Sequence, residues 1–102
     1  MIKLIESNRS QLEELCERYH VKRLALFGSA ASGAFDFGTS DLDFVVDFEP
    51  TDDMNLADQY FGLLEGLQML FQRRIDLVTE RSIRNPYFKR AVDQTRIPLY
   101  AA

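Results

Sequence analysis

The chain has 102 residues, of which 46% are hydrophobic and 27% are charged, values typical of a folded globular domain and not of a disordered chain. Twelve Lys and Arg residues against sixteen Asp and Glu residues give a formal net charge of −4, which argues against general binding to a nucleic-acid backbone. A chain of this length is expected to form one domain, over residues 1–102. Because the single cysteine cannot form an internal disulfide and no apolar run is long enough to span a membrane, we expect the protein in the cytoplasm.

The spacing of apolar residues predicts alternating helices and strands along the chain. In chain order these are a helix over about 7–19 (with Ser10 as an alternative start), a strand over 21–27, a small-residue loop over 28–33, a strand over 41–48, a helix over about 56–71 with its cap within 50–53, a strand over 74–78, a helix from Asn85–Pro86 to about 93, and an extended segment over 97–100. This order predicts an α/β (α+β) fold, in which a small mixed β-sheet is flanked by helices that lie on one of its faces.

Charge is distributed unevenly along the chain. Residues 24–72 carry nine acidic side chains and no Lys or Arg, whereas residues 73–102 carry seven basic and three acidic side chains. A charge run of this kind is usually a solvated face. Two of the aspartates, Asp41 and Asp43, lie inside a strongly apolar segment, which a solvated face does not explain.

Three aspartates are candidates for one site. Asp41 and Asp43 begin the second predicted strand and share a face of it, and Asp76 lies between apolar residues of the third predicted strand. If the two strands pair, the carboxylates converge, and two carboxylates ~4 Å apart repel by about 4 kcal/mol at an effective dielectric of 20. The middle of the chain offers no basic partner, so a hard divalent cation such as Mg²⁺ is the natural compensation. The alternative is three unrelated surface aspartates.

The loop after the first predicted strand has small residues that allow close approach to an anion. Gly28 and Gly33 permit this approach and Ser29 adds a hydroxyl donor, and a helix beginning near Ser29 would favour phosphate through its free N–H groups. The loop is not a Walker A sequence, because Ala34 and Phe35 stand where Lys and Ser or Thr are required. A Gly-Ser turn alone is more often a turn without a ligand. It indicates a phosphate site here because it lies next to the predicted strand that carries Asp41 and Asp43.

Taken together, these segments resemble the minimal nucleotidyltransferase (MNT) family of the polymerase-β-type superfamily. The resemblance runs through Leu26-Phe27-Gly28-Ser29, Gly33, Ser40-Asp41-Leu42-Asp43-Phe44-Val45-Val46 and Ile75-Asp76-Leu77-Val78, and it continues in Ile83-Arg84-Asn85-Pro86-Tyr87 and Leu99-Tyr100. It covers nearly the whole chain and implies the polymerase-β-like nucleotidyltransferase fold.

The resemblance also implies roles and partners. It implies that the catalytic residues and the ligands of two Mg²⁺ ions are Asp41, Asp43 and Asp76, and that Asp76 also orients or deprotonates the acceptor hydroxyl. It implies that the triphosphate of the substrate ATP is held by Gly28, Ser29, Gly33 and Ser40. Small members of the family are commonly encoded beside a HEPN-domain toxin, for which they act as antitoxins, some by adenylylating it.

One departure from the family concerns the phosphates. Family members often carry an aromatic or basic residue after Gly-Ser and a basic residue before the next Gly, whereas this chain has Ala30, Ala31 and Ser32. We therefore expect a cation from elsewhere to take that place. The candidates are a partner protein and the arginines of the last third of the chain, namely Arg73, Arg74, Arg81 and Arg84.

Three functions remain open from the sequence. The first is a Mg²⁺-dependent nucleotidyltransferase that moves AMP from ATP to a hydroxyl of a partner protein. The second is an antitoxin that acts by binding its partner with weak or no catalysis, and the third is a small nucleotide-binding regulator. The intact aspartates favour the first, and the missing loop cation favours the second. Homo- or hetero-oligomers are compatible with apolar residues expected at the surface, such as Leu99 and Tyr100.

Overall fold

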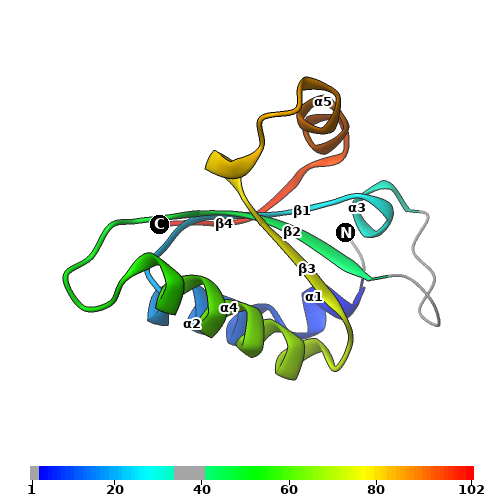
Figure 1. The fold of residues 1–102 in the computed structure, drawn as a ribbon. Coiled ribbons are helices and arrows are strands. Elements are labelled where there is room, and N and C mark those ends of the chain that lie inside the picture. The colour runs from blue at the N-terminus through cyan, green and yellow to red at the C-terminus, as the bar shows by residue number, and fades with distance from the viewer. Residues whose placement is uncertain (1–2, 34–40) are drawn as a thin grey trace.

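The computed structural model describes residues 3–33 and 41–102, which form a four-stranded β-sheet with helices around it (Figure 1). In chain order the elements are α1 (Lys3–Ser7), α2 (Arg9–Arg18), β1 (Val21–Phe27), α3 (Ser29–Ser32), β2 (Leu42–Phe48), α4 (Leu56–Phe71), β3 (Ile75–Thr79), the 3-10 helix η1 (Glu80–Ser82), α5 (Pro86–Thr95) and β4 (Ile97–Ala101). The strand order is β3-β2-β1-β4. Because β1 is antiparallel to β2 and β4 while β2 is parallel to β3, the sheet is mixed, as predicted.

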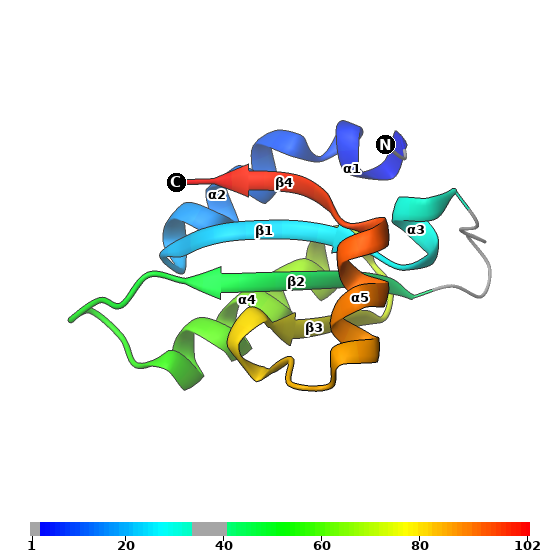
Figure 2. The same cartoon turned by 90° about the horizontal axis from the view of Figure 1, so that it is seen from above.

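Helices cover both faces of this sheet, so the prediction that they lie on one face is wrong. Helices α2 and α4 lie on one side, and α5 crosses the strands on the other (Figures 1 and 2). The reason is that the central strands carry apolar side chains on both faces. Phe44 of β2 belongs to the main core with α2 and α4. On the opposite face Ala25, Phe27 and Val45 form a second cluster, which Val92 of α5 closes.

Two glycines bring α2 and α4 together. A Cβ atom on Gly62 would overlap the ring of Tyr19, and one on Gly66 would overlap the side chain of Leu15. Although a glycine inside a helix costs roughly 1 kcal/mol relative to Ala, these two positions allow the close approach that buries Leu63 of α4 completely. The main core thus lies between the α2–α4 pair and the sheet.

An asparagine directly precedes three of the helices, and in two of them its side chain caps the helix. Asn85 accepts hydrogen bonds from the N–H groups of Tyr87 and Phe88, which confirms the predicted start of α5. The cap of α4 is Asn55, which accepts from the N–H of Asp58 at 2.8 Å, and not a residue within 50–53. Asn8 precedes α2 and separates it from α1, a helix that the sequence pattern did not predict.

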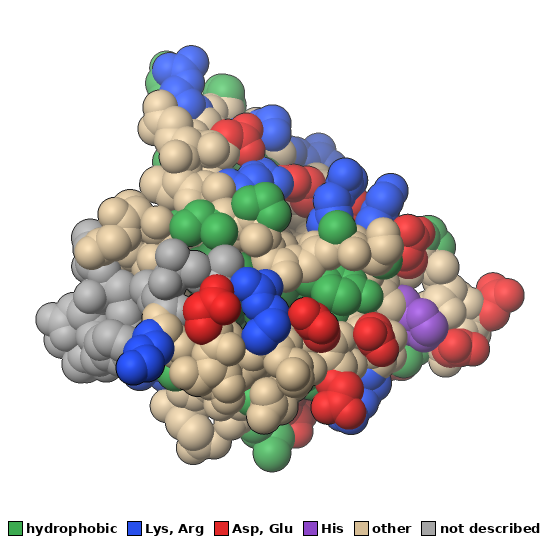
Figure 3. Space-filling view, turned by 180° about the vertical axis from the view of Figure 1, so that it is seen from behind, with side chains coloured by type: hydrophobic (Ala, Val, Ile, Leu, Met, Phe, Trp, Pro, Cys, Tyr) green, Lys and Arg blue, Asp and Glu red, His purple; other side chains and the backbone are tan. Residues whose placement is uncertain are grey.

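Acidic and basic side chains are distributed unevenly on the face drawn in Figure 3, although both kinds lie on each side of the sheet. In Figure 3 acidic side chains are numerous on the side covered by α2, whereas many Lys and Arg side chains lie on the α5 side. Leu99, which was expected at the surface, is buried in the main core. Within the described ranges, no helix is both long and apolar enough to cross a membrane.

Candidate functional site

The expected pairing of the second and third strands is present, and it brings two of the predicted carboxylates together. In the register of the sheet, Phe27 of β1 pairs with Asp43 of β2, and Asp43 pairs with Asp76 of β3. Neighbouring strands lie about 4.8 Å apart, and side chains at paired positions point to the same face. The end of β1 and the starts of β2 and β3 therefore place Asp43 and Asp76 side by side, next to the turn that begins at Gly28.

Side-chain alternation places these carboxylates on the face that α5 covers. Leu42 and Phe44 point into the main core, while Val45 belongs to the cluster closed by α5. Asp43 lies on the same face as Val45 and is partly buried, because it belongs to an interior strand of the sheet. Asp76 belongs to the edge strand and is exposed. Asp43 and Asp76 form an aspartate patch in which the carboxylate of Asp43 is partly buried and that of Asp76 is open to solvent.

The third predicted carboxylate lies at the same end of the sheet but faces an arginine. Asp41 directly precedes β2, and its Oδ1 lies 4.0 Å from Nε of Arg74, which directly precedes β3. The backbone fixes this neighbourhood, because the N–H of Leu42 donates to the carbonyl of Arg74 at 3.2 Å. In residues 3–33 and 41–102, no three His, Cys, Asp or Glu side chains are arranged as a ready-made metal site.

The surroundings of Asp43 raise the pKa of its carboxylate. The pKa of Asp43 is raised from 3.8 to about 6 by burial, and then by the charges of Asp76 and Asp41. Tyr60, whose hydroxyl donates to the carbonyl of Leu77 at 2.6 Å, also has its pKa raised by burial and by Asp76. The carboxylate oxygens and the negative charge of this patch suit Mg²⁺, which proteins usually bind with one or two carboxylates plus substrate phosphates.

The turn after β1 requires glycine at its first position. Gly28 has φ 75° and ψ −147°, a conformation that residues with a Cβ rarely adopt. A Cβ on Gly28 would also overlap the carboxylate of Asp43. The backbone N–H of Gly28 donates to Oγ1 of Thr95 at 2.9 Å, so Gly28 makes room for the Asp43 carboxylate and has no free N–H to offer a ligand.

The remaining loop residues lie beyond this turn. Ser29 begins α3, as expected, and the first N–H groups of a helix have no partner within it. Gly33 ends α3 in a left-handed conformation with open space where a Cβ would be. Ser40, also predicted to hold phosphate, lies outside the described residues.

Two contacts at this site were not predicted from the sequence, that of Thr95 with Gly28 and that of Arg74 with Asp41. Thr95 contacts Gly28 from a helix 67 positions away in the sequence, and no local pattern indicates that contact. Arg74 was one of four candidate cations, and its place beside Asp41 follows only from the strand pairing. Arg81, by contrast, lines a hollow with Phe48 and Thr51 at the far end of β2.

Replacing Asp43 by Asn is expected to stabilise the protein above about pH 6. Since the folded state raises the pKa of Asp43, the protonated form favours folding; that contribution is fully present below pH 3.8 and is lost as pH rises through about 6. After allowance for solvent around a partly exposed carboxylate, the gain at about pH 8 is on the order of 1 kcal/mol. Urea unfolding of both proteins, at about pH 8 and at about pH 3.5, measures it.

Asp47→Asn is the matched control for this stability change, because Asp47 lies on the same face of β2 but pairs with Arg23 at 3.3 Å. It should give no gain at high pH. An Asp43→Asn variant no more stable than wild type at about pH 8 would show that burial and the neighbouring carboxylates do not disfavour the charged form of Asp43 as argued.

Comparisons with known proteins identify the family to which this chain belongs. Residues 9–98 match the nucleotidyltransferase domain family. A relative from Methanocaldococcus jannaschii, named provisionally as a protein adenylyltransferase, is 35% identical over 89 residues, which cover 87% of this chain and 87% of the relative.

Solved structures share the fold. One described provisionally as a minimal nucleotidyltransferase superposes with a TM-score of 0.75 at 31% identity and covers 95% of this chain and 96% of its own. A toxin–antitoxin structure with AMP-PNP has a TM-score of 0.70 at 22% identity, covering 93% of this chain and 74% of that one. A complex of a tri-AMPylated HEPN toxin with an MNT antitoxin from Shewanella oneidensis has a TM-score of 0.64 at 19% identity, covering 95% and 72%.

Proposed function

The chain belongs to the nucleotidyltransferase domain family, and on that premise we propose that it transfers AMP from ATP to a hydroxyl group of a partner protein. The observation that carries this proposal is the register of the sheet, which sets Asp43 and Asp76 side by side next to the Gly28 turn. We further propose that residues 1–102 act as one domain, and that the protein works in the cytoplasm, where ATP is available.

In this proposal Asp41, Asp43 and Asp76 hold two Mg²⁺ ions, which would neutralise charge on the phosphates during an in-line displacement. Asp76, exposed on the edge strand, orients the acceptor hydroxyl and accepts its proton. The hydroxyl oxygen forms a bond to the α-phosphorus of ATP while the bond from that phosphorus to the bridging oxygen breaks, and pyrophosphate leaves.

The turn and the start of α3 hold the triphosphate. Gly28 lets the carboxylate of Asp43 lie close to the backbone of the turn, and the backbone and hydroxyl of Ser29 supply donors at the first turn of α3. Gly33 and Ser40 complete this phosphate-binding set in the proposal. Because the loop has no basic side chain, the phosphates need one cation besides the metal ions.

We assign that cation to Arg74. Its side chain is exposed at the start of β3 and lies 4.0 Å from Asp41, so it can move to a phosphate when Asp41 turns toward a metal ion. Arg74→Ala is expected to weaken ATP binding by roughly 10-fold, the effect of one charge-assisted hydrogen bond, while Arg74→Lys retains most of the affinity. Calorimetric titration of ATP with Mg²⁺ measures the difference.

Arg81→Ala controls for the loss of a positive charge at a distance, because Arg81 lies near Phe48 at the far end of β2. It should bind ATP as wild type does. Equal binding by wild type and Arg74→Ala would exclude Arg74 and return the role to Arg73, Arg84 or a partner's cation.

A HEPN-domain toxin is the partner in this proposal. What supports it is the resemblance of this fold to the antitoxin chains of toxin–antitoxin structures. Co-expression with the product of the adjacent gene, followed by purification of the pair and incubation with radiolabelled ATP, tests the transfer. The label is expected on the partner protein and should depend on Mg²⁺.

The second candidate function is an antitoxin that neutralises its partner by binding alone. The contact of Asp41 with Arg74 favours it, because an aspartate that pairs with an arginine is less available to a metal ion. The Asp41→Ala/Asp43→Ala double variant separates the two functions. If the variant neutralises the partner as well as wild type does, binding is sufficient; if it fails while still binding the partner, transfer is required.

A further inference from the structure

We infer that Thr95, the last residue of α5, is a positioning residue that fixes the Gly28 turn for ATP, an inference that rests on the proposed function. Oγ1 of Thr95 accepts a hydrogen bond of 2.9 Å from the N–H of Gly28. This bond joins the helix on one face of the sheet to the end of β1. It is the contact through which α5 reaches the turn beside the aspartates.

The direction of the Thr95 hydroxyl is set by its own helix. The hydroxyl donates to the carbonyl of Ala91 at 3.2 Å, so its hydrogen points back into α5 and a lone pair faces Gly28. The hydroxyl therefore acts both as a donor, to Ala91, and as an acceptor, from Gly28. Serine can reproduce this arrangement, whereas valine has the same shape and no oxygen.

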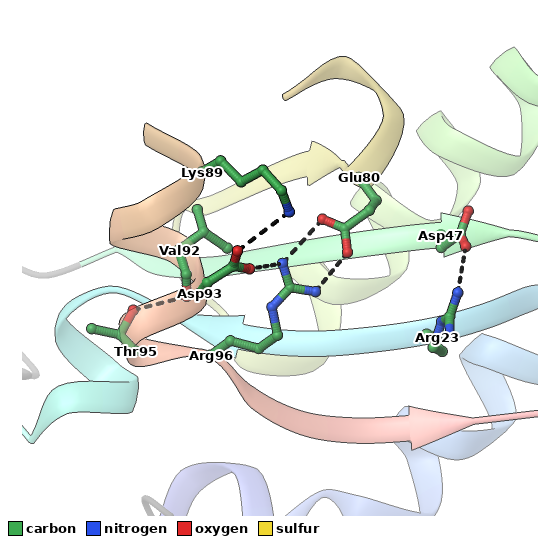
Figure 4. A network of polar contacts seen from close by, with 8 residues as sticks. All are labelled: Arg23, Asp47, Glu80, Lys89, Val92, Asp93, Thr95 and Arg96. Atoms are coloured by element: carbon green, nitrogen blue, oxygen red, sulfur yellow. Dashed lines mark hydrogen bonds and ion pairs between the residues drawn. The ribbon is translucent and has the colours of Figure 1, made fainter. Parts of the chain in front are cut away.

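An ion-pair network next to Thr95 holds the end of α5 over the sheet (Figure 4). Arg96 donates to both carboxylate oxygens of Glu80 at 2.6 and 3.1 Å, and to Asp93 at 2.7 Å. The hydrogen bond from Arg96 holds the pKa of Glu80 below its usual range. Together with the complete burial of Val92, these contacts give Thr95 a fixed place from which to hold the turn.

The turn needs such support because its conformation is unusual and its neighbour is charged. Gly28 has φ 75° and faces the carboxylate of Asp43. The Thr95 bond fixes the peptide between Phe27 and Gly28, and with it the direction in which the chain enters α3. The carbonyl of Gly28 also accepts from the N–H of Ser32 at 3.0 Å, which holds the far side of the turn. Without the Thr95 bond the peptide before Gly28 rotates more freely, because glycine permits many backbone conformations, and the donors at Ser29 are held less firmly.

Thr95→Val is expected to raise the dissociation constant of ATP in the presence of Mg²⁺ by roughly 5- to 10-fold, the effect of one lost hydrogen bond, and Thr95→Ser to restore it. In transfer assays the KM for ATP should rise by a similar factor while kcat changes little. Calorimetric titration gives the binding constants independently of transfer. Thr51→Val is the matched control, because Thr51 Oγ1 also accepts from a backbone N–H, that of Asp53, but lies at the far end of β2.

Different results overturn different statements. If wild type fails to bind ATP with Mg²⁺, the proposed function is wrong. If wild type binds and Thr95→Val binds equally well, or if Thr51→Val loses as much affinity, the positioning role of Thr95 is wrong. Should Thr95→Val fail to fold, hydrogen exchange of the Gly28 amide decides: slow exchange in wild type and in Thr95→Ser supports the role, and fast exchange in wild type overturns it.

Discussion

Asp43→Asn is expected to lower the rate of AMP transfer by about 10³-fold or more, because holding metal-bound charge at the phosphates supplies several kcal/mol of transition-state stabilisation. Asp43 is the central member of the patch, paired with Asp76 on one side and with Phe27, next to the Gly28 turn, on the other. An amide removes the negative charge that a cation requires. Initial rates of label transfer to the partner protein measure the loss.

The matched control for this loss is Asp47→Asn. Asp47 lies on the same face of β2, about 13 Å further along the strand, and contacts Arg23 and not the patch. Its transfer rate should stay within about twofold of wild type. Since Asp43→Asn is also expected to be more stable at high pH, unfolding cannot explain its loss of activity. A transfer rate near that of wild type in Asp43→Asn would remove this carboxylate from the mechanism.

The second large effect is expected from Gly28→Ala. The added Cβ meets the carboxylate of Asp43, and the backbone conformation at φ 75° and ψ −147° is strained for any residue with a side chain. The strain should cost about 1–3 kcal/mol of folding stability. Displacement of Asp43 should lower the transfer rate by about 10²-fold, since a shift of 1 Å in a reacting group has effects of that size.

Gly33→Ala separates strain from displacement when rates are compared at saturating ATP, because Gly33 also belongs to the proposed phosphate-binding set. Gly33 also has a positive φ, 87°, but nothing lies within 4 Å of the position that a Cβ would take. Its substitution should cost about 1–2 kcal/mol of stability without moving Asp43. Unfolding curves and transfer rates of the two variants, measured side by side, test this difference. Equal activity losses in both would mean that strain alone, and not the contact with Asp43, explains the effect of Gly28→Ala.

The sequence predicted the strands and the aspartate patch because both follow from local patterns. Alternation within residues 41–48 separates Asp43 and Val45 from Leu42 and Phe44, and the structure has these two sets on opposite faces. The pairing of the second and third strands then places Asp76 next to Asp43. To predict this pairing, it was enough to assume that neighbouring apolar segments belong to one sheet.

Features that depend on distant contacts were not predictable in this way. The position of α5 on the second face follows from apolar side chains on both sides of β1 and β2, which a periodicity count does not assign to a partner. The bond from Gly28 to Thr95 and the contact of Arg74 with Asp41 join residues whose proximity is fixed only by tertiary structure. These contacts hold the loop and, in our proposal, place Arg74 where it can reach a phosphate.

The central claim is that carboxylates from β2 and β3 share metal ions beside the Gly28 turn. Anomalous diffraction from crystals grown with Mn²⁺ and a non-hydrolysable ATP analogue tests it most directly. We predict metal peaks about 2.0–2.3 Å from carboxylate oxygens of Asp43 and Asp76, with Asp41 turned away from Arg74 and the triphosphate beside Gly28 and Ser29. Analogue bound with its triphosphate elsewhere, or metal that contacts neither Asp43 nor Asp76, would contradict the claim.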